Sequence, residues 1–150
     1  MFWKKKPMLP QAIQESVVAA IRQAEAHTTG EIRVFIEHHC NYIDALDRAA
    51  ELFTSLGMVQ TEMRNAVLIY LAVTNKQFAL YGDESVYSKV GGAGFWQQAA
   101  ELLQNGLRNG AIDDGLVSCI TALGQAMALH FPYNSEVEKN ELPDEIVFGK

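Results

Sequence analysis

The spacing of apolar side chains predicts four helices. The first begins at Pro10, a residue suited to a first helical turn, and ends near His27. The second covers residues 46–56 and stops at Gly57, because glycine readily ends a helix. The same helical period continues over residues 95–107 and 112–127, so two further helices follow in the second half of the chain.

Three strands are predicted between these helices. Residues 32–36 alternate between apolar and polar side chains, as in a strand with one buried face, although Phe35 breaks the alternation and indicates partial cover on the other face. Residues 66–73 are continuously apolar, which is typical of a central strand buried on both faces. Residues 77–81 return after a short polar turn, so these two strands should form a hairpin.

This order of elements predicts an α/β fold, a three-layer α/β/α sandwich with a small mixed sheet of three to four strands. A helix links the first strand to the central strand, which favours a parallel pair with a right-handed crossover. Residues 1–9 are expected to form an N-terminal arm and residues 10–132 a single domain. Residues 133–150 are rich in acids and poor in apolar groups, so we expect a tail that is at most partly ordered.

Net charge and composition narrow the possible binding partners and the expected cellular compartment. The chain has 150 residues, enough for one domain, and its net charge of −6 disfavours binding to nucleic acid or to anionic membranes. The lysines at positions 4–6 are not followed by an apolar stretch, and the longest apolar run is too short to span a bilayer. Cys40 and Cys119 suit a reducing compartment as ordinary buried residues. The sequence therefore predicts a cytoplasmic protein without a transmembrane segment, and leaves its oligomeric state open.

Candidate metal ligands lie where the predicted elements end. Asp83 and Glu84 follow the second strand of the hairpin, Asp113 and Asp114 open the last helix, and Glu31 precedes the first strand. Such carboxylates could supply the hard oxygen ligands that Ca²⁺ or Mg²⁺ prefers, at strand ends where α/β sheets commonly bind ligands. Capping of helix N-termini is the competing interpretation of both acidic pairs.

Two polar residues before the central strand are candidate ligand-binding groups. Arg64 could hold a phosphate or carboxylate with two hydrogen bonds, and Asn65 could bind a cation or cap a turn. An ion pair between Arg64 and a neighbouring acid is the competing interpretation. The run from His38 to Cys40 does not predict a metal site, because adjacent strand side chains point to opposite faces.

Several segments together resemble the TPM domain family over roughly residues 10–130. They are Thr29-Gly30-Glu31-Ile32, Leu56-Gly57-Met58, Arg64-Asn65-Ala66-Val67-Leu68-Ile69 and Tyr81-Gly82-Asp83. The closing segment from Asn140 to Val147 resembles the end of a short, soluble branch of that family. The resemblance implies links to acid-phosphatase activity, to divalent-cation binding, and to accessory roles on larger membrane complexes.

Two functions remain open, and the sequence does not decide whether the chain is an enzyme. Phosphatase signatures are missing: neither cysteine is followed after five residues by arginine, and no glycine-rich loop ends in Gly-Lys-Ser or Gly-Lys-Thr. The favoured hypothesis is a non-catalytic binding or accessory module that contacts another protein, with the tail docking through Leu142 and Ile146. The alternative is a divalent-metal-dependent, phosphatase-like hydrolase.

Overall fold

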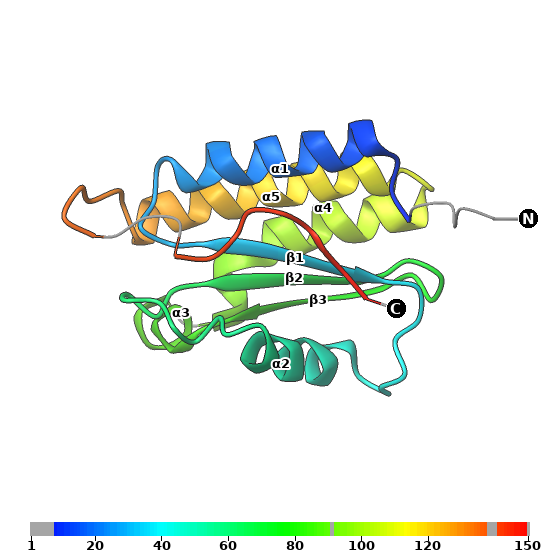
Figure 1. Ribbon diagram of the computed structural model, residues 1–150, viewed down its shortest axis with the longest axis horizontal. Coiled ribbons are helices and arrows are strands. Elements are labelled where there is room, and N and C mark those ends of the chain that lie inside the picture. The colour runs from blue at the N-terminus through cyan, green and yellow to red at the C-terminus, as the bar shows by residue number, and fades with distance from the viewer. Residues whose placement is uncertain (1–7, 91, 138–140, 150) are drawn as a thin grey trace, which may run out of the picture.

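The computed structural model describes residues 8–90, 92–137 and 141–149, and within them a sheet lies between two layers of helices (Figure 1). The strands, in the order β3-β2-β1-β4, are β1 (Ile32–Glu37), β2 (Val67–Ala72), β3 (Gln77–Gly82) and β4 (Val147–Phe148). One face of the sheet is covered by α1 (Gln11–Glu25), α4 (Gln97–Arg108) and α5 (Ile112–His130), and the other by α2 (Ala45–Ser55). The predicted three-layer α/β fold with a mixed sheet is confirmed.

β2 is the centre of the sheet. All of its residues are buried, and it pairs in parallel with β1 and antiparallel with β3. The predicted hairpin and the parallel pair are therefore confirmed. The hairpin turn ends at Lys76, which has a positive φ of 54°. Gly57, which the sequence predicted to stop the second helix, follows the end of α2 and has a positive φ of 70°.

The core lies on both sides of the sheet because strand side chains alternate between its faces. Ile32, Val34 and Ile36 of β1 belong to the cluster under α1, α4 and α5. Phe35, together with Leu68 of β2, belongs to the cluster under α2. Both faces of β1 are thus covered, which explains why Phe35 breaks the alternation in the sequence.

α5 is the longest helix of the described residues, and it packs against both α1 and α4. Close approach to α4 depends on glycine, because a Cβ at Gly115 would lie 2.8 Å from the Cα of Gly106. In the part of the chain that the structure describes, α5 is also the one helix long and apolar enough to cross a membrane. Core helices of soluble proteins have the same composition, and residues such as Leu116 and Ile120 of α5 lie in the core.

Two elements differ from the prediction. A short helix, α3 (Glu84–Val90), starts directly after β3, where the sequence predicted no helix. The 3₁₀ turn η1 (Gly92–Trp96) follows and includes the first two positions of the helix predicted over residues 95–107, so α4 begins later than predicted. Within the segment predicted as an at most partly ordered tail, residues 141–149 contribute the short strand β4, which extends the sheet by pairing in parallel with β1. Leu142 is only 7% exposed, and Ile146 is partly buried against the core. These two side chains pack on their own domain rather than standing ready for another protein, whereas the predicted N-terminal arm lies mostly outside the described residues.

Candidate functional site

A cleft of about 570 Å³ opens where β3 ends and α3 begins. Three of the candidate residues from the sequence, Arg64, Asp83 and Glu84, lie in its wall. The remaining lining residues are Phe53, Thr54, Val59, Tyr81, Gly82 and Ser88. The structure therefore brings part of the predicted site together in one concave surface.

The side chains of Arg64 and Asp83 form an ion pair in this cleft. The Nε of Arg64 donates to Oδ2 of Asp83 at 2.7 Å, and Nη2 donates to Oδ1 at 2.8 Å. Oδ1 also accepts a hydrogen bond from the backbone amide of Glu84, the first residue of α3, at 2.7 Å. The ion-pair interpretation of Arg64 is confirmed, whereas a capping bond from Asp83 to the second or third amide of α3 stays a prediction. A cation at Asp83 would have to compete with Arg64 for both carboxylate oxygens.

The backbone at Arg64 is unusual. Its φ is 51°, in the left-handed region that residues with a Cβ adopt at an energetic cost. Contacts from α3 hold this conformation, because the amide of Ser85 donates to the carbonyl of Arg64 at 3.0 Å. The Ser85 hydroxyl donates in turn to the carbonyl of Met63 at 2.8 Å. Strained residues concentrate at functional sites, so this conformation is a second reason to place the site here.

Asn65 follows Arg64 directly and Glu31 precedes β1, and neither residue lines the cleft. The side-chain amide of Asn65 donates to Oγ1 of Thr29 at 3.0 Å, and Asn65 is 1% exposed. Glu31 is equally buried, and its Oε1 accepts a hydrogen bond from the amide of Leu142 at 2.6 Å. Asn65 thus joins the segments that precede β1 and β2, and Glu31 joins the start of β1 to the C-terminal segment, which is a structural use of residues predicted as ligands.

Asp113 and Asp114 lie in the first turn of α5. Figure 1 shows this turn at the end of the molecule opposite to the end of β3. α5 has 19 residues and is therefore about 28 Å long, and its far end at His130 is the one that packs near η1. One ion cannot join these acids to Asp83. They remain first-turn acids whose charge suits a helix N-terminus.

The candidate carboxylates do not form a shared metal site in this arrangement. Asp83 is occupied by Arg64, and Asp113 and Asp114 are at the other end of the sheet. Within the described ranges, no group of three or more histidine, cysteine, aspartate or glutamate side chains is placed to hold a metal ion. Calcium or magnesium binding therefore stays a prediction from the sequence.

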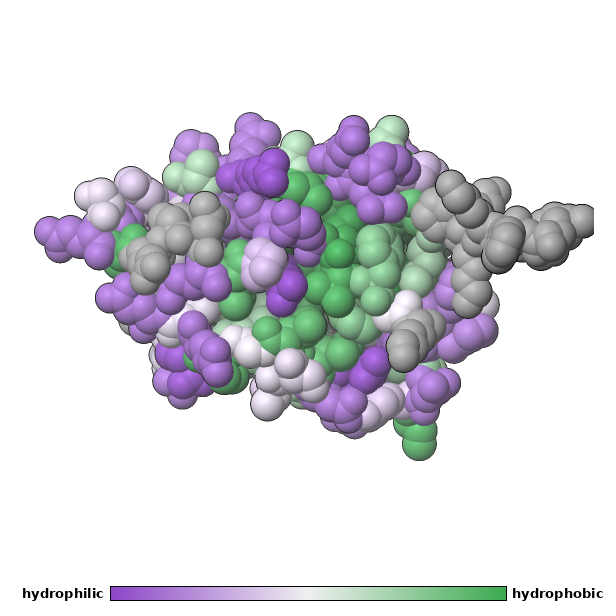
Figure 2. All heavy atoms as spheres, viewed as in Figure 1, coloured by the Kyte–Doolittle hydropathy of each residue, from purple (hydrophilic) through white to green (hydrophobic). Residues whose placement is uncertain are grey.

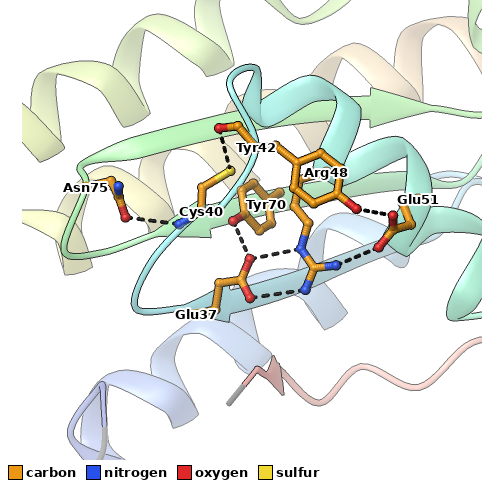
Figure 3. Close-up of polar contacts among 7 residues, drawn as sticks. All are labelled: Glu37, Cys40, Tyr42, Arg48, Glu51, Tyr70 and Asn75. Carbon is orange, nitrogen blue, oxygen red and sulfur yellow. Dashed lines mark hydrogen bonds and ion pairs between the residues drawn. The ribbon is translucent and has the colours of Figure 1, made fainter.

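A polar network that sequence patterns did not indicate lies where β1 ends (Figure 3). Arg48 of α2 donates through Nε and Nη2 to the two oxygens of Glu37, at 3.0 and 3.1 Å. Its Nη1 donates to Glu51 at 2.9 Å, and Figure 3 shows Arg48 between the two carboxylates. The hydroxyl of Tyr70 donates to Glu37 from β2, and that of Tyr42 donates to Glu51. Arg48 and Glu51 are three positions apart on α2, a local spacing, but the contacts of Glu37 with Arg48 and Tyr70 span 11 and 33 positions, so no local pattern could have found those.

The electrostatics of this network favour an ionised Glu37. Burial alone would raise the pKa of Glu37, but the hydrogen bonds from Arg48 and Tyr70 outweigh burial and hold that pKa below its ordinary value. Burial and the bond to Glu37 raise the pKa of the Tyr70 hydroxyl. Each charged group thus has a partner. The network fixes the loop between β1 and α2, whose residue Ile43 is fully exposed.

The cysteines are not arranged as nucleophiles. Cys119 is fully buried, and burial raises the pKa of its thiol to about 12. Cys40 is also buried, and its thiol contacts the carbonyl of Tyr42. The interpretation of both cysteines as ordinary buried residues is confirmed, while the neighbouring His38 and His39 are exposed.

Comparison with known proteins gives a family and a fold. The model of the TPM domain family matches residues 5–126. The NMR structure of the BA42 protein from the psychrophilic bacterium Bizionia argentinensis shares 38% identity with a TM-score of 0.88, covering 97% of this chain and 99% of that chain. No curated protein matches the chain.

Two more distant solved structures share the fold alone. The N-terminal domain of the cg2496 protein from Corynebacterium glutamicum has 12% identity and a TM-score of 0.65, covering 85% of this chain and 87% of that one. The N-terminal domain of a protein from P. gingivalis has 15% identity and a TM-score of 0.58, covering 85% of this chain and 83% of that one.

Proposed function

Because the chain belongs to the TPM domain family, we propose that it acts as a non-catalytic binding or accessory module that contacts another protein through the cleft at the end of β3. The observation that carries this proposal is the ion pair between Arg64 and Asp83. The Asp83 carboxylate and the Arg64 guanidinium are bonded to each other, so they shape a surface instead of serving as free reactive groups.

The make-up of the cleft supports protein binding. The rings of Phe53 and Tyr81 pack in its wall with their centroids 5.1 Å apart. Beside them, the side chain of Glu84 is 68% exposed and that of Arg64 is 37% exposed. Phe53 is buried and supports Tyr81, which is partly exposed, and tyrosine and arginine are among the residue types that dominate binding at protein interfaces. Ser88 is exposed, but the residues that line the cleft include no histidine that could activate it.

The alternative is the divalent-metal-dependent hydrolase. It requires Asp83 to exchange Arg64 for a metal ion, because both carboxylate oxygens are engaged. Such an exchange would be visible as a thermal shift with Ca²⁺ or Mg²⁺ that is lost in Asp83→Asn. It would also require turnover of a phosphate ester such as p-nitrophenyl phosphate. Both results together would replace the binding-module proposal by the hydrolase.

A capture experiment tests the binding module directly. The wild-type chain, a Ser88→Arg variant and a control Ser16→Arg variant are immobilised and exposed to a cell extract, and the retained proteins are quantified. Ser88 lies in the cleft wall, whereas Ser16 is an exposed serine of α1. We expect a protein that is retained by the wild type and the control but lost with Ser88→Arg. If the same proteins bind all three chains, the cleft is not the contact surface.

A further inference from the structure

Residues 141–149 form a strap along the edge of the sheet. In Figure 1 this segment runs in front of β1, from the end where β1 starts to the end where it finishes. The amide of Leu142 donates to Glu31 at one end, and the amide of Gly149 donates to the carbonyl of Ile36 at 2.8 Å at the other. Between them, Asp144 pairs with Arg22 of α1 at 3.4 Å. The strap is thus tied to both α1 and β1.

Carboxyl groups meet beneath the strap. Glu25, the last residue of α1, is 3% exposed, and its Oε2 accepts a hydrogen bond from the amide of Ile32 at 2.7 Å. Its other oxygen, Oε1, is buried without a donor, and so is Oδ1 of Asp144. Asp144 raises the pKa of Glu25 both as a hydrogen-bonding partner and through its charge, so the two carboxyl groups are neighbours beneath the strap. Two ionised carboxylates would be unfavourable there, because neighbouring like charges repel strongly in a buried place.

A single proton held between the two carboxyl groups removes this repulsion. A proton on Oε1 of Glu25 can be donated to Oδ1 of Asp144, which gives both buried oxygens a partner while Oδ2 of Asp144 keeps Arg22. The surroundings favour this state. Burial raises the pKa of Glu25 most, the Ile32 amide lowers it, and Asp144 and Glu31 raise it further, to about 9. Glu25 therefore carries a proton at neutral pH.

The charged groups around this pair are few in the described structure. Asp144 and Glu31 face Glu25 from the strap side and from the start of β1, and Arg22 reaches Asp144 from the same helix. From α5, Gly124 packs against Ala24, and Met127 contacts the chain at Gly30. Neither residue of α5 titrates. The carboxyl groups of Glu25, Asp144 and Glu31 are thus the acidic groups that meet under the strap.

We propose that residues 141–149 are a releasable strap, and that the proton shared by Glu25 and Asp144 locks it onto α1 and β1. Release separates the two acids and lets both ionise in water. It also frees the edge of β1 and uncovers Glu37, because Gly149 lies so close to Glu37 and Phe35 that an added Cβ would come within 2.9 Å of each. Figure 2 views the face that the strap crosses, where apolar side chains run through the middle between hydrophilic groups.

Opening the strap is coupled to loss of the proton. A carboxyl group in water has a pKa near 4.5, whereas Glu25 under the strap keeps its proton up to about pH 9. Between these values the closed state binds one more proton than the open state. The equilibrium constant for opening therefore rises about tenfold for each unit of pH over this window.

Amide hydrogen exchange of the full chain, followed by NMR, tests this coupling. Exchange of an ordinary protected amide accelerates about tenfold per pH unit, so its logarithm rises with a slope of about one. For the amides of Leu142 and Gly149 we expect a slope of about two between roughly pH 5 and pH 8, because opening contributes a further factor of ten. An amide of β2, such as that of Ile69, serves as the internal reference for global unfolding.

Variants complete the test. Glu25→Gln keeps a donor at this position without a titrating proton, so the slope should fall to about one. The control Glu15→Gln removes an exposed acid of the same helix and should leave the slope at about two. Asp144→Asn removes the other acid and should also lower the slope, which keeps the test available if Glu25→Gln does not fold. A wild-type slope of about one, or an unprotected Gly149 amide at about pH 6, would overturn the proposal.

Discussion

Arg64 and Asp83 form an ion pair with two hydrogen bonds across 19 positions of sequence, and this pair joins the turn before β2 to the residue that precedes α3. The same carboxylate accepts a hydrogen bond from the amide of Glu84, the first residue of α3. One buried side chain thus fixes a strained turn, a helix start and the wall of the cleft.

Removing Asp83 should loosen all three features. In Asp83→Ala, Arg64 loses its partner and the amide of Glu84 loses its acceptor, and each lost hydrogen bond costs about 1 kcal/mol of unfolding free energy. Urea denaturation should show a clearly larger loss than for Asp113→Ala, which removes a first-turn acid that caps through its charge alone. Equal losses for the two variants would mean that the ion pair contributes no stability.

The turn of the β2–β3 hairpin offers a stabilising substitution. Lys76 has a φ of 54°, which glycine adopts without strain. We expect Lys76→Gly to raise the unfolding free energy by about 0.5 kcal/mol, since the strain relieved exceeds the flexibility added to the unfolded chain. Lys76→Ala is the matched control, because it removes the same side chain but keeps a Cβ. A gain of the same size in Lys76→Ala would assign the effect to charge instead of backbone.

Stability should depend on pH through Glu25. The folded state holds the proton of Glu25 up to about pH 9, whereas the unfolded chain releases it near pH 4.5. The folded state binds more protons between these values, so stability falls as pH rises, by on the order of 1 kcal/mol per unit. The difference in unfolding free energy between wild type and Glu25→Gln isolates this contribution. It should shift in favour of the variant from about pH 5 to about pH 8.5, and a constant difference would contradict the assignment.

The contribution of Glu37 to stability should change with pH in the direction opposite to that of Glu25. Its folded pKa lies below the ordinary value, so its contribution to stability is present above that value and is lost as pH falls. Tyr70→Phe removes one of the hydrogen bonds that hold this pKa down, and should cost about 1 kcal/mol of unfolding free energy. A carboxyl carbon titration by NMR should show a higher pKa for Glu37 in the variant. An unchanged pKa would leave Arg48 as the sole cause of the depression.

The elements that were predictable from the sequence have a strong period or a long apolar run. β2 is apolar from end to end because both of its faces are buried, and α1 shows its buried stripe directly. β4 could not be found in this way. It has two residues and pairs with β1 more than a hundred positions away, so the acidic composition of residues 133–150 hides it.

The candidate site was predictable only in part. Arg64, Asp83 and Glu84 stand next to element ends, and the hairpin brings those ends together. The separation of Asp83 from Asp113 was not predictable, because the direction in which α5 crosses the sheet depends on tertiary packing. The contact between Arg48 and Glu37, and that between Glu25 and Asp144, also depend on which loops fold over which strand.

The short pairing of β4 with β1 has a consequence for how the protein is handled. An uncovered strand edge is a template for strand pairing between molecules, and proteins commonly protect such edges against aggregation. A chain shortened to residue 140 would expose the backbone of β1 beside the apolar groups that Leu142 and Ile146 now cover. Affinity tags are therefore better attached at the amino terminus, and a shortened chain should collect in inclusion bodies.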